Sequence, residues 1–160
     1  MTAPQEAAAD FWIAHLGLEL HPEGGYFRES YRSGLGLQLA AGERSASTAI
    51  YFLVTADRPS RFHRLQADEI WHFYRGDALE ICCIAPDGQL EIQVLGTDIF
   101  AGESLQLRVP AGTWFGARVR AGGAYTLCGC TMAPGFDFAD FELATRHDLL
   151  QAFPQHASIV

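Results

Sequence analysis

The chain of 160 residues is 49% hydrophobic and 19% charged, a balance typical of a globular protein rather than a disordered one. Its formal net charge of −8 argues against nucleic acid as a partner, because phosphate groups are bound by basic surfaces. No apolar run reaches the roughly 18 residues that a membrane-spanning helix needs, so we expect no membrane partner. At this length we expect one domain over residues 1–160.

The N-terminal residues lack the basic and apolar stretches of a secretory signal, so we expect a cytoplasmic protein. Cysteines stay reduced in that compartment. The sequence contains four cysteines within apolar runs, and we expect all of them to be buried core residues rather than a thiol site: Cys82, Cys83, Cys128 and Cys130.

The first predicted element is a helix over residues 3–16. Thr2 is a suitable capping residue before it, and Gly17 is a suitable residue to end it. Pro22 and the glycines that follow it predict a turn between this helix and the next element.

The alternation after this turn predicts a strand from Tyr26 to Arg32. In a regular strand Arg28 and Arg32 share one face, which is either solvated or lines an anion-binding pocket. The glycine-rich stretch Gly34–Arg44 is expected to be a loop.

Short strand-like runs separated by glycine and proline turns fill the rest of the chain to about residue 135. They have no helices between them, so the pattern predicts an all-β sandwich or barrel over residues 20–135 and excludes a parallel α/β sheet. Residues 136–160 form a C-terminal segment with a short helix near Ala144–Ala152. The predicted strands are Thr48–Val54, Leu79–Ile84, Leu90–Leu95, Ser104–Val109, Trp114–Val119 and Ala124–Thr131.

A dense polar cluster lies between two of these apolar runs, in the stretch RFHRLQADEIWHFYRG. His63 and Glu69 are its main candidates for chemistry. Three interpretations are open for this pair: acid–base work or ligand binding in a pocket, a buried polar network, or metal binding. His72 is a further candidate, although strand alternation directs it away from Glu69 unless a bulge intervenes.

The cluster resembles the first motif of the cupin superfamily, in which His-x-His is followed by Glu and then Gly. His63, Glu69 and Gly76 stand at those positions, and Pro110-Ala-Gly112 resembles the second motif. The other two ligand positions of the usual metal site are occupied by apolar residues, Leu65 and Phe115. The resemblance therefore implies no metal cofactor, with only a weak site at His63 and Glu69.

Several further segments resemble the cupin branch labelled domain of unknown function 985: HPEGGYFRE, VPAGTWF and APGFDFADFE. This resemblance implies a double-stranded β-helix, the cupin jelly-roll barrel, with an N-terminal helix and a short C-terminal helix. It also implies a pocket at one mouth of the barrel and a homodimer.

Metal-poor cupin pockets resemble those of deoxysugar epimerases, which move protons beside a keto group. We therefore expect a pocket for a small polar metabolite, a carbohydrate or nucleotide-sugar, with metal-independent isomerase or epimerase activity. The alternatives are a non-catalytic binding or sensing module and a metal-dependent enzyme with an incomplete ligand set. The candidate catalytic residues are His63, Glu69 and His72, and the candidate ligand-binding residues are Tyr26, Arg28, Arg64, Trp71, Trp114 and Phe115.

Overall fold

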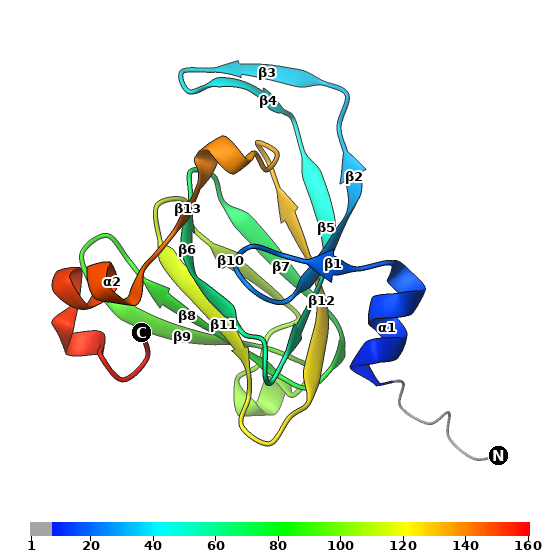
Figure 1. The fold of residues 1–160 in the computed structure, drawn as a ribbon, viewed down its shortest axis with the longest axis vertical. Coiled ribbons are helices and arrows are strands. Elements are labelled where there is room, and N and C mark those ends of the chain that lie inside the picture. The colour runs from blue at the N-terminus through cyan, green and yellow to red at the C-terminus, as the bar shows by residue number, and fades with distance from the viewer. Residues whose placement is uncertain (1–7) are drawn as a thin grey trace.

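Two β-sheets face one another and close into a barrel in the computed structural model, which describes residues 8–160 (Figure 1). One sheet has six strands in the order β1-β2-β5-β12-β7-β10, and the other has five in the order β13-β6-β11-β8-β9. Non-consecutive strands are neighbours in both sheets, as expected for a double-stranded β-helix. The predicted all-β jelly-roll barrel is confirmed.

The strands of the described residues are β1 Glu19–Leu20, β2 Tyr26–Arg32, β3 Gly36–Leu39, β4 Gly42–Ser45, β5 Thr48–Thr55, β6 Ser60–Leu65, β7 Glu69–Gly76, β8 Leu79–Ile84, β9 Leu90–Leu95, β10 Gln106–Val109, β11 Trp114–Val119, β12 Tyr125–Met132 and β13 Phe141–Leu143. The α-helices are α1 Ala9–Leu16 and α2 Arg146–Ala152. Short 3-10 turns lie at η1 Ile99–Ala101, η2 Phe138–Asp140 and η3 Pro154–His156.

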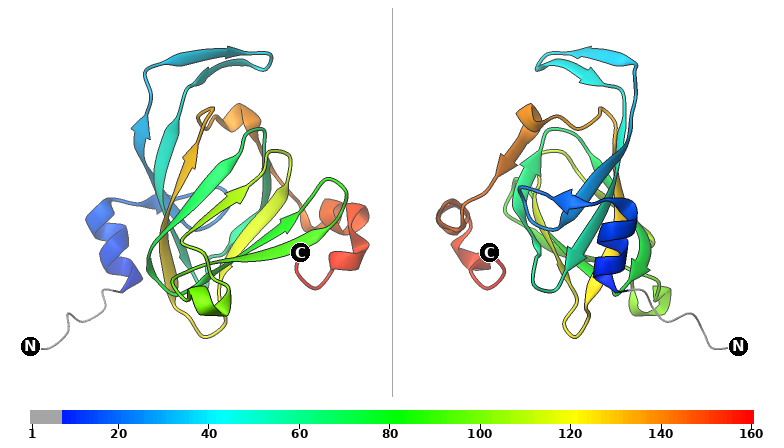
Figure 2. Two further views of the ribbon diagram at one scale, coloured as in Figure 1. Left: turned by 180° about the vertical axis from the view of Figure 1, so that it is seen from behind. Right: turned by 45° about the vertical axis from the view of Figure 1, so that its right-hand side comes forward.

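The two helices lie outside the barrel on opposite sides (Figure 2). Helix α1 ends at Gly17, whose φ of 62° is left-handed, as the sequence predicted. The predicted Thr2 cap lies outside the described residues. Helix α2 begins later than predicted because the Thr145 hydroxyl accepts a hydrogen bond from the Asp148 N–H at 3.1 Å. Within residues 8–160, no helix is long and apolar enough to cross a membrane.

The prediction of a loop over Gly34–Arg44 is wrong. Strands β3 and β4 form a hairpin here that extends beyond the barrel (Figure 1). Leucine recurs at every second position from Leu35 to Leu39, a strand pattern that the surrounding glycines obscured. The hairpin is tied to the C-terminal segment by an ion pair of 2.7 Å between Arg44 and Asp140.

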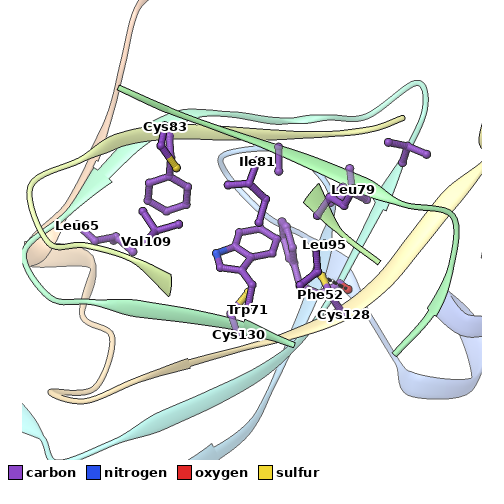
Figure 3. Close-up of a cluster of buried hydrophobic side chains, with 14 of the residues drawn as sticks. Phe52, Leu65, Trp71, Leu79, Ile81, Cys83, Leu95, Val109, Cys128 and Cys130 are labelled. Carbon is purple, nitrogen blue, oxygen red and sulfur yellow. Dashed lines mark hydrogen bonds between the residues drawn. The ribbon is translucent and has the colours of Figure 1, made fainter. Parts of the chain in front are cut away.

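The apolar core fills the space between the two sheets. Figure 3 shows the indole of Trp71 within this cluster, close to Phe52 and Ile81. Trp71 and Phe52 meet edge to face with their ring centroids 5.6 Å apart. All four cysteines are free and buried, as predicted.

The loop between β1 and β2 is held against β6 by several contacts. The Arg61 backbone N–H donates to the Glu23 carbonyl at 2.8 Å, and the Arg61 guanidinium donates to the Pro22 carbonyl at 2.5 Å. Gly24 has a φ of +114°, and a Cβ at this residue would lie 2.1 Å from the Pro59 carbonyl oxygen. Only glycine fits this position, so Gly24 fixes where the neighbouring Glu23 side chain points.

Replacing Gly24 by Ala is expected to destabilise the protein more than replacing Gly122 by Ala. Gly122 also has a positive φ, +89°, but a Cβ at this residue would meet nothing within 4 Å. Gly122→Ala therefore adds only backbone strain, which costs about 1–3 kcal/mol. Gly24→Ala adds a backbone clash to that strain. Urea unfolding of both variants measures the difference, and equal losses of unfolding free energy would contradict the tight contact between this loop and β6.

Candidate active site

A cavity of about 270 Å³ lies between the two sheets of the barrel. Its walls combine aromatic and aliphatic side chains with several ionisable ones, a composition typical of a small-molecule site. The polar lining residues are His21, Glu23, Glu29, Arg32, Thr48, His63, Glu69 and Asp137. The apolar ones are Phe27, Ile50, Phe52, Leu65, Trp71, Cys130, Met132, Phe136 and Phe138.

Two rows of paired residues from the six-stranded sheet form one wall of this cavity. Residues that are directly opposite one another on neighbouring strands place their side chains on the same face. The register therefore aligns four cavity residues in each row across β2, β5, β12 and β7. The rows are Glu29, Ile50, Cys130 and Trp71, and Arg32, Thr48, Met132 and Glu69.

A β-bulge in β2 decides which arginine reaches the cavity. The register with β5 shifts between Glu29 and Tyr31, so strand alternation is broken there. Arg32 consequently shares the cavity face with Glu29. Arg28 lies outside the cavity, with its guanidinium 5.8 Å from the ring centroid of Tyr51.

Glu23 is the carboxyl group that contacts His63. The Nε2 atom of His63 lies 3.1 Å from Glu23 Oε2, and the Ser60 hydroxyl donates to Glu23 Oε1 at 2.7 Å. His63 Nδ1 lies 2.8 Å from the carbonyl oxygen of Arg61. A carbonyl oxygen only accepts, so Nδ1 carries the proton in neutral His63 and Nε2 is left to accept one from Glu23.

Burial favours the neutral forms of both members of this pair. It raises the pKa of Glu23 to about 8, against smaller opposing effects of the Ser60 hydrogen bond and the Arg61 charge. Burial likewise lowers the pKa of His63 to about 4, although the hydrogen bond to the Arg61 carbonyl opposes it. At neutral pH the pair is thus an imidazole that accepts a hydrogen bond from a carboxylic acid.

Glu69 and His21 extend this neutral polar group. Trp71 Nε1 donates to Glu69 Oε2 at 2.8 Å, and burial together with the charge of Glu23 raises the pKa of Glu69 to about 8. His21 Nδ1 accepts from the Glu23 backbone N–H at 3.2 Å. Burial, and then the charge of His63, lower the pKa of His21 to about 4. The cavity therefore offers two protonated carboxyl groups and two neutral imidazoles.

His72 lies on the opposite face of β7 from Glu69 and Trp71, as strand alternation indicated. Its Nε2 atom lies 2.8 Å from the Thr131 hydroxyl, and its Nδ1 atom lies 3.0 Å from the side-chain amide nitrogen of Gln106. It does not line the cavity, so the structure does not bring this candidate catalytic residue to the other two.

Of the candidate ligand-binding residues, Trp71 lines the cavity and five others do not. Arg64 lies over the ring of Trp114 at 4.4 Å, on the outside of the barrel, and pairs with Glu142. Tyr26 packs in the cluster beneath helix α1. Phe115 is buried against the His63 ring at a centroid distance of 4.1 Å, and Arg28 lies outside the cavity as described above.

The sequence-based prediction missed five ionisable cavity residues, of which Glu29 lies on β2. Glu23 and His21 lie in the segment HPEGG. Its two glycines predicted a turn, but they did not predict that the turn packs against β6. Arg32 and Asp137 were also missed, the first because of the bulge in β2 and the second because it lies on a loop.

The residues present do not fit the metal site that a cupin motif implies. Leu65 and Phe115 stand at two of the four ligand positions, and Phe115 packs against the His63 ring. The lone pair on His63 Nε2 faces Glu23, and Glu69 accepts from Trp71. Within residues 8–160, no group of three or more His, Cys, Asp or Glu side chains has a geometry that could hold a metal ion.

The barrel and its motif residues define a cupin. The family model described as Cupin superfamily (DUF985) matches residues 10–144, and the chain belongs to this family.

Two solved structures and one further protein show how close its relatives are. A hypothetical protein from Leishmania major is 38% identical with a TM-score of 0.92, covering 96% of this chain and 97% of its own. Protein SO0799 from Shewanella oneidensis is 43% identical with a TM-score of 0.91, and the match covers 96% of this chain and 95% of that protein. The uncharacterized protein YML079W of Saccharomyces cerevisiae is 30% identical over 146 residues, which is 82% of this chain and 72% of the yeast protein.

The unfolding free energy is expected to fall between pH 7 and pH 8. The folded protein keeps the protons of Glu23 and Glu69 up to a pKa of about 8, whereas the unfolded chain loses them near the ordinary value of 4.5. The folded state thus binds more protons, and its stability declines with rising pH by up to roughly 1 kcal/mol per pH unit for each carboxyl.

Urea unfolding at several pH values measures this slope. Glu23→Gln and Glu69→Gln should each reduce it, while Glu91→Gln, which removes an exposed carboxyl on β9, should leave it unchanged. A flat profile in the wild-type protein would mean that the buried carboxyls are ionised.

Proposed function

We propose that this protein is a metal-independent isomerase or epimerase that moves a proton beside the carbonyl group of a small polar metabolite, of the carbohydrate class. One observation carries the proposal: the pair of His63 and Glu23, 3.1 Å apart, shares an apolar cavity with a second buried carboxyl, Glu69. A proton donor and a proton acceptor in one water-poor site are what such a reaction needs.

The proposed reaction assigns one role to each group. Glu69, protonated at neutral pH, donates its proton to the carbonyl oxygen of the substrate. The Glu23 carboxyl takes the proton from the adjacent carbon as its own proton passes to His63 Nε2, which gives an enediol, a protonated His63 and an ionised Glu69. Return of a proton to either face of that carbon, or to the neighbouring carbon, regenerates the carbonyl, and Glu69 recovers its proton.

Neighbouring side chains keep these groups in place. Ser60 holds the Glu23 carboxyl through Oε1, which leaves Oε2 directed at His63. Trp71 holds Glu69 in the same way through Oε2. These hydrogen bonds support the proposal because they hold both carboxyl groups in place before the substrate arrives.

The size of the cavity limits the substrate. Pockets for drug-sized ligands span roughly 300–1,000 Å³, so 270 Å³ suits a molecule of about monosaccharide size. A nucleotide attached to such a sugar would lie outside the cavity. The apolar faces of Phe52 and Trp71 offer the surface on which the carbon skeleton of a sugar packs.

The test is deuterium exchange from D₂O into aldoses and ketoses, followed by NMR. For at least one of these sugars, wild-type protein is expected to exchange the proton on the carbon next to the carbonyl group for deuterium. Glu23→Gln and Glu69→Gln should slow the exchange by at least about 100-fold, the usual contribution of a general acid or base. Metal removal with a chelator should leave the rate unchanged.

His72→Gln is the matched control, because His72 is a histidine of β7 that lies outside the cavity. It should exchange at the wild-type rate. Saturable sugar binding without any exchange would contradict the proposed reaction and favour a non-catalytic binding module.

A further inference from the structure

The walls of the cavity carry more acid than base. Among the described residues that line it, four have carboxyl groups and Arg32 alone has a permanent positive charge. The carboxyl residues are Glu23, Glu29, Glu69 and Asp137. Of these carboxyl groups, Glu23 and Glu69 are protonated at neutral pH and Glu29 is paired with Arg32, so an anionic ligand finds no unpaired permanent positive charge among the described lining residues.

Arg32 is already engaged with other groups. Its Nε and Nη2 atoms donate to the two carboxyl oxygens of Glu29 at 2.9 and 2.8 Å, and Nη2 also donates to the Phe136 carbonyl at 3.0 Å. A bidentate pair of this kind satisfies both charges. These bonds leave only the Nη1 group for a phosphate or carboxylate, and the neighbouring Glu29 carboxylate would repel the same ligand.

The apolar part of the wall is mainly aromatic. Among the described lining residues, five have a phenyl or indole ring: Phe27, Phe52, Trp71, Phe136 and Phe138. They meet at steep angles, for example 83° between Phe136 and Phe138. The face of an aromatic ring attracts a cation, and the attraction is strongest where water is excluded.

We propose that the molecule bound in this cavity carries a positive charge, as a protonated or quaternary amine, held between the aromatic walls and the carboxyl group of Glu23. This inference rests on the proposed function and narrows its substrate class to amine-bearing polar metabolites, such as amino sugars. The approach of an ammonium group favours the ionised form of Glu23, whose proton passes to His63, while Glu69 keeps the proton that the proposed reaction needs.

A series of ligands with one shape and three charges tests the proposal on wild-type protein. Choline is cationic, 3,3-dimethylbutan-1-ol is its neutral analogue, and 3,3-dimethylbutanoate is an anionic analogue. Calorimetry at pH 7 should show choline binding at least about tenfold more tightly than the alcohol, with the anion weakest. Equal or tighter binding of the alcohol or the anion would overturn the proposal.

Glu23→Gln tests the role of this carboxyl group while preserving its shape. It should reduce the affinity for choline by about tenfold and change that for the alcohol little. Glu91→Gln, on the outer strand β9, should change neither affinity. If Glu23→Gln binds choline as tightly as wild type, the assignment of the cation to this carboxyl is wrong.

This result can be separated from the result of the exchange assay. Choline binding without exchange in any sugar would support the charge selectivity and contradict the proposed reaction. Exchange into neutral sugars that choline does not inhibit would support the reaction and overturn the charge selectivity. Faster exchange into glucosamine than into glucose, with inhibition by choline, would support both.

Discussion

The contact between His63 and Glu23 inside the barrel is the interaction on which the site depends. It joins a strand of the five-stranded sheet to the loop that precedes β2 of the other sheet, across 3.1 Å. Unpaired, either group would be costly to bury, whereas together they satisfy one another as neutral donor and acceptor. Gly24, Ser60 and Arg61 all serve this contact, because each one fixes the loop or the carboxyl itself.

The environment of this contact differs from that of the usual cupin metal site. Leu65 and Phe115 fill two of the four ligand positions with apolar atoms, which lowers the polarity around the two residues that remain. In that environment His63 and Glu69 both favour their neutral forms. The positions that hold a metal ion in the usual cupin motif therefore carry two apolar and two neutral polar side chains.

The fold was largely predictable from the sequence, and the site only in part. Glycine and proline turns delimit β2, β8, β9 and β11, and these strands begin and end where the sequence indicated. His63, Glu69 and Trp71 were also assigned to the cavity region, because their spacing follows a known motif and strand alternation places the latter two on one face. Patterns of this kind involve only residues that are close together in the sequence, so they can be recognised without the structure.

The residues that were missed depend on contacts between distant parts of the chain. Glu23 enters the cavity because its loop rests on β6, about forty positions later, and no local pattern encodes that contact. Arg32 replaces Arg28 because a single bulge reverses the alternation of β2. In both cases the local pattern predicted the element correctly, and a tertiary contact or a bulge decided where the side chain points.

The protonation state of His63 at neutral pH is the most direct test of this account. Nitrogen-15 NMR of the histidine rings distinguishes the two neutral tautomers from the imidazolium ion. We expect His63 at pH 7 to be neutral with its proton on Nδ1, and to stay neutral as the pH falls until it approaches its lowered pKa of about 4. An imidazolium signal from His63 at pH 7 would contradict the account, because the pair would then be ionic and Glu23 a carboxylate.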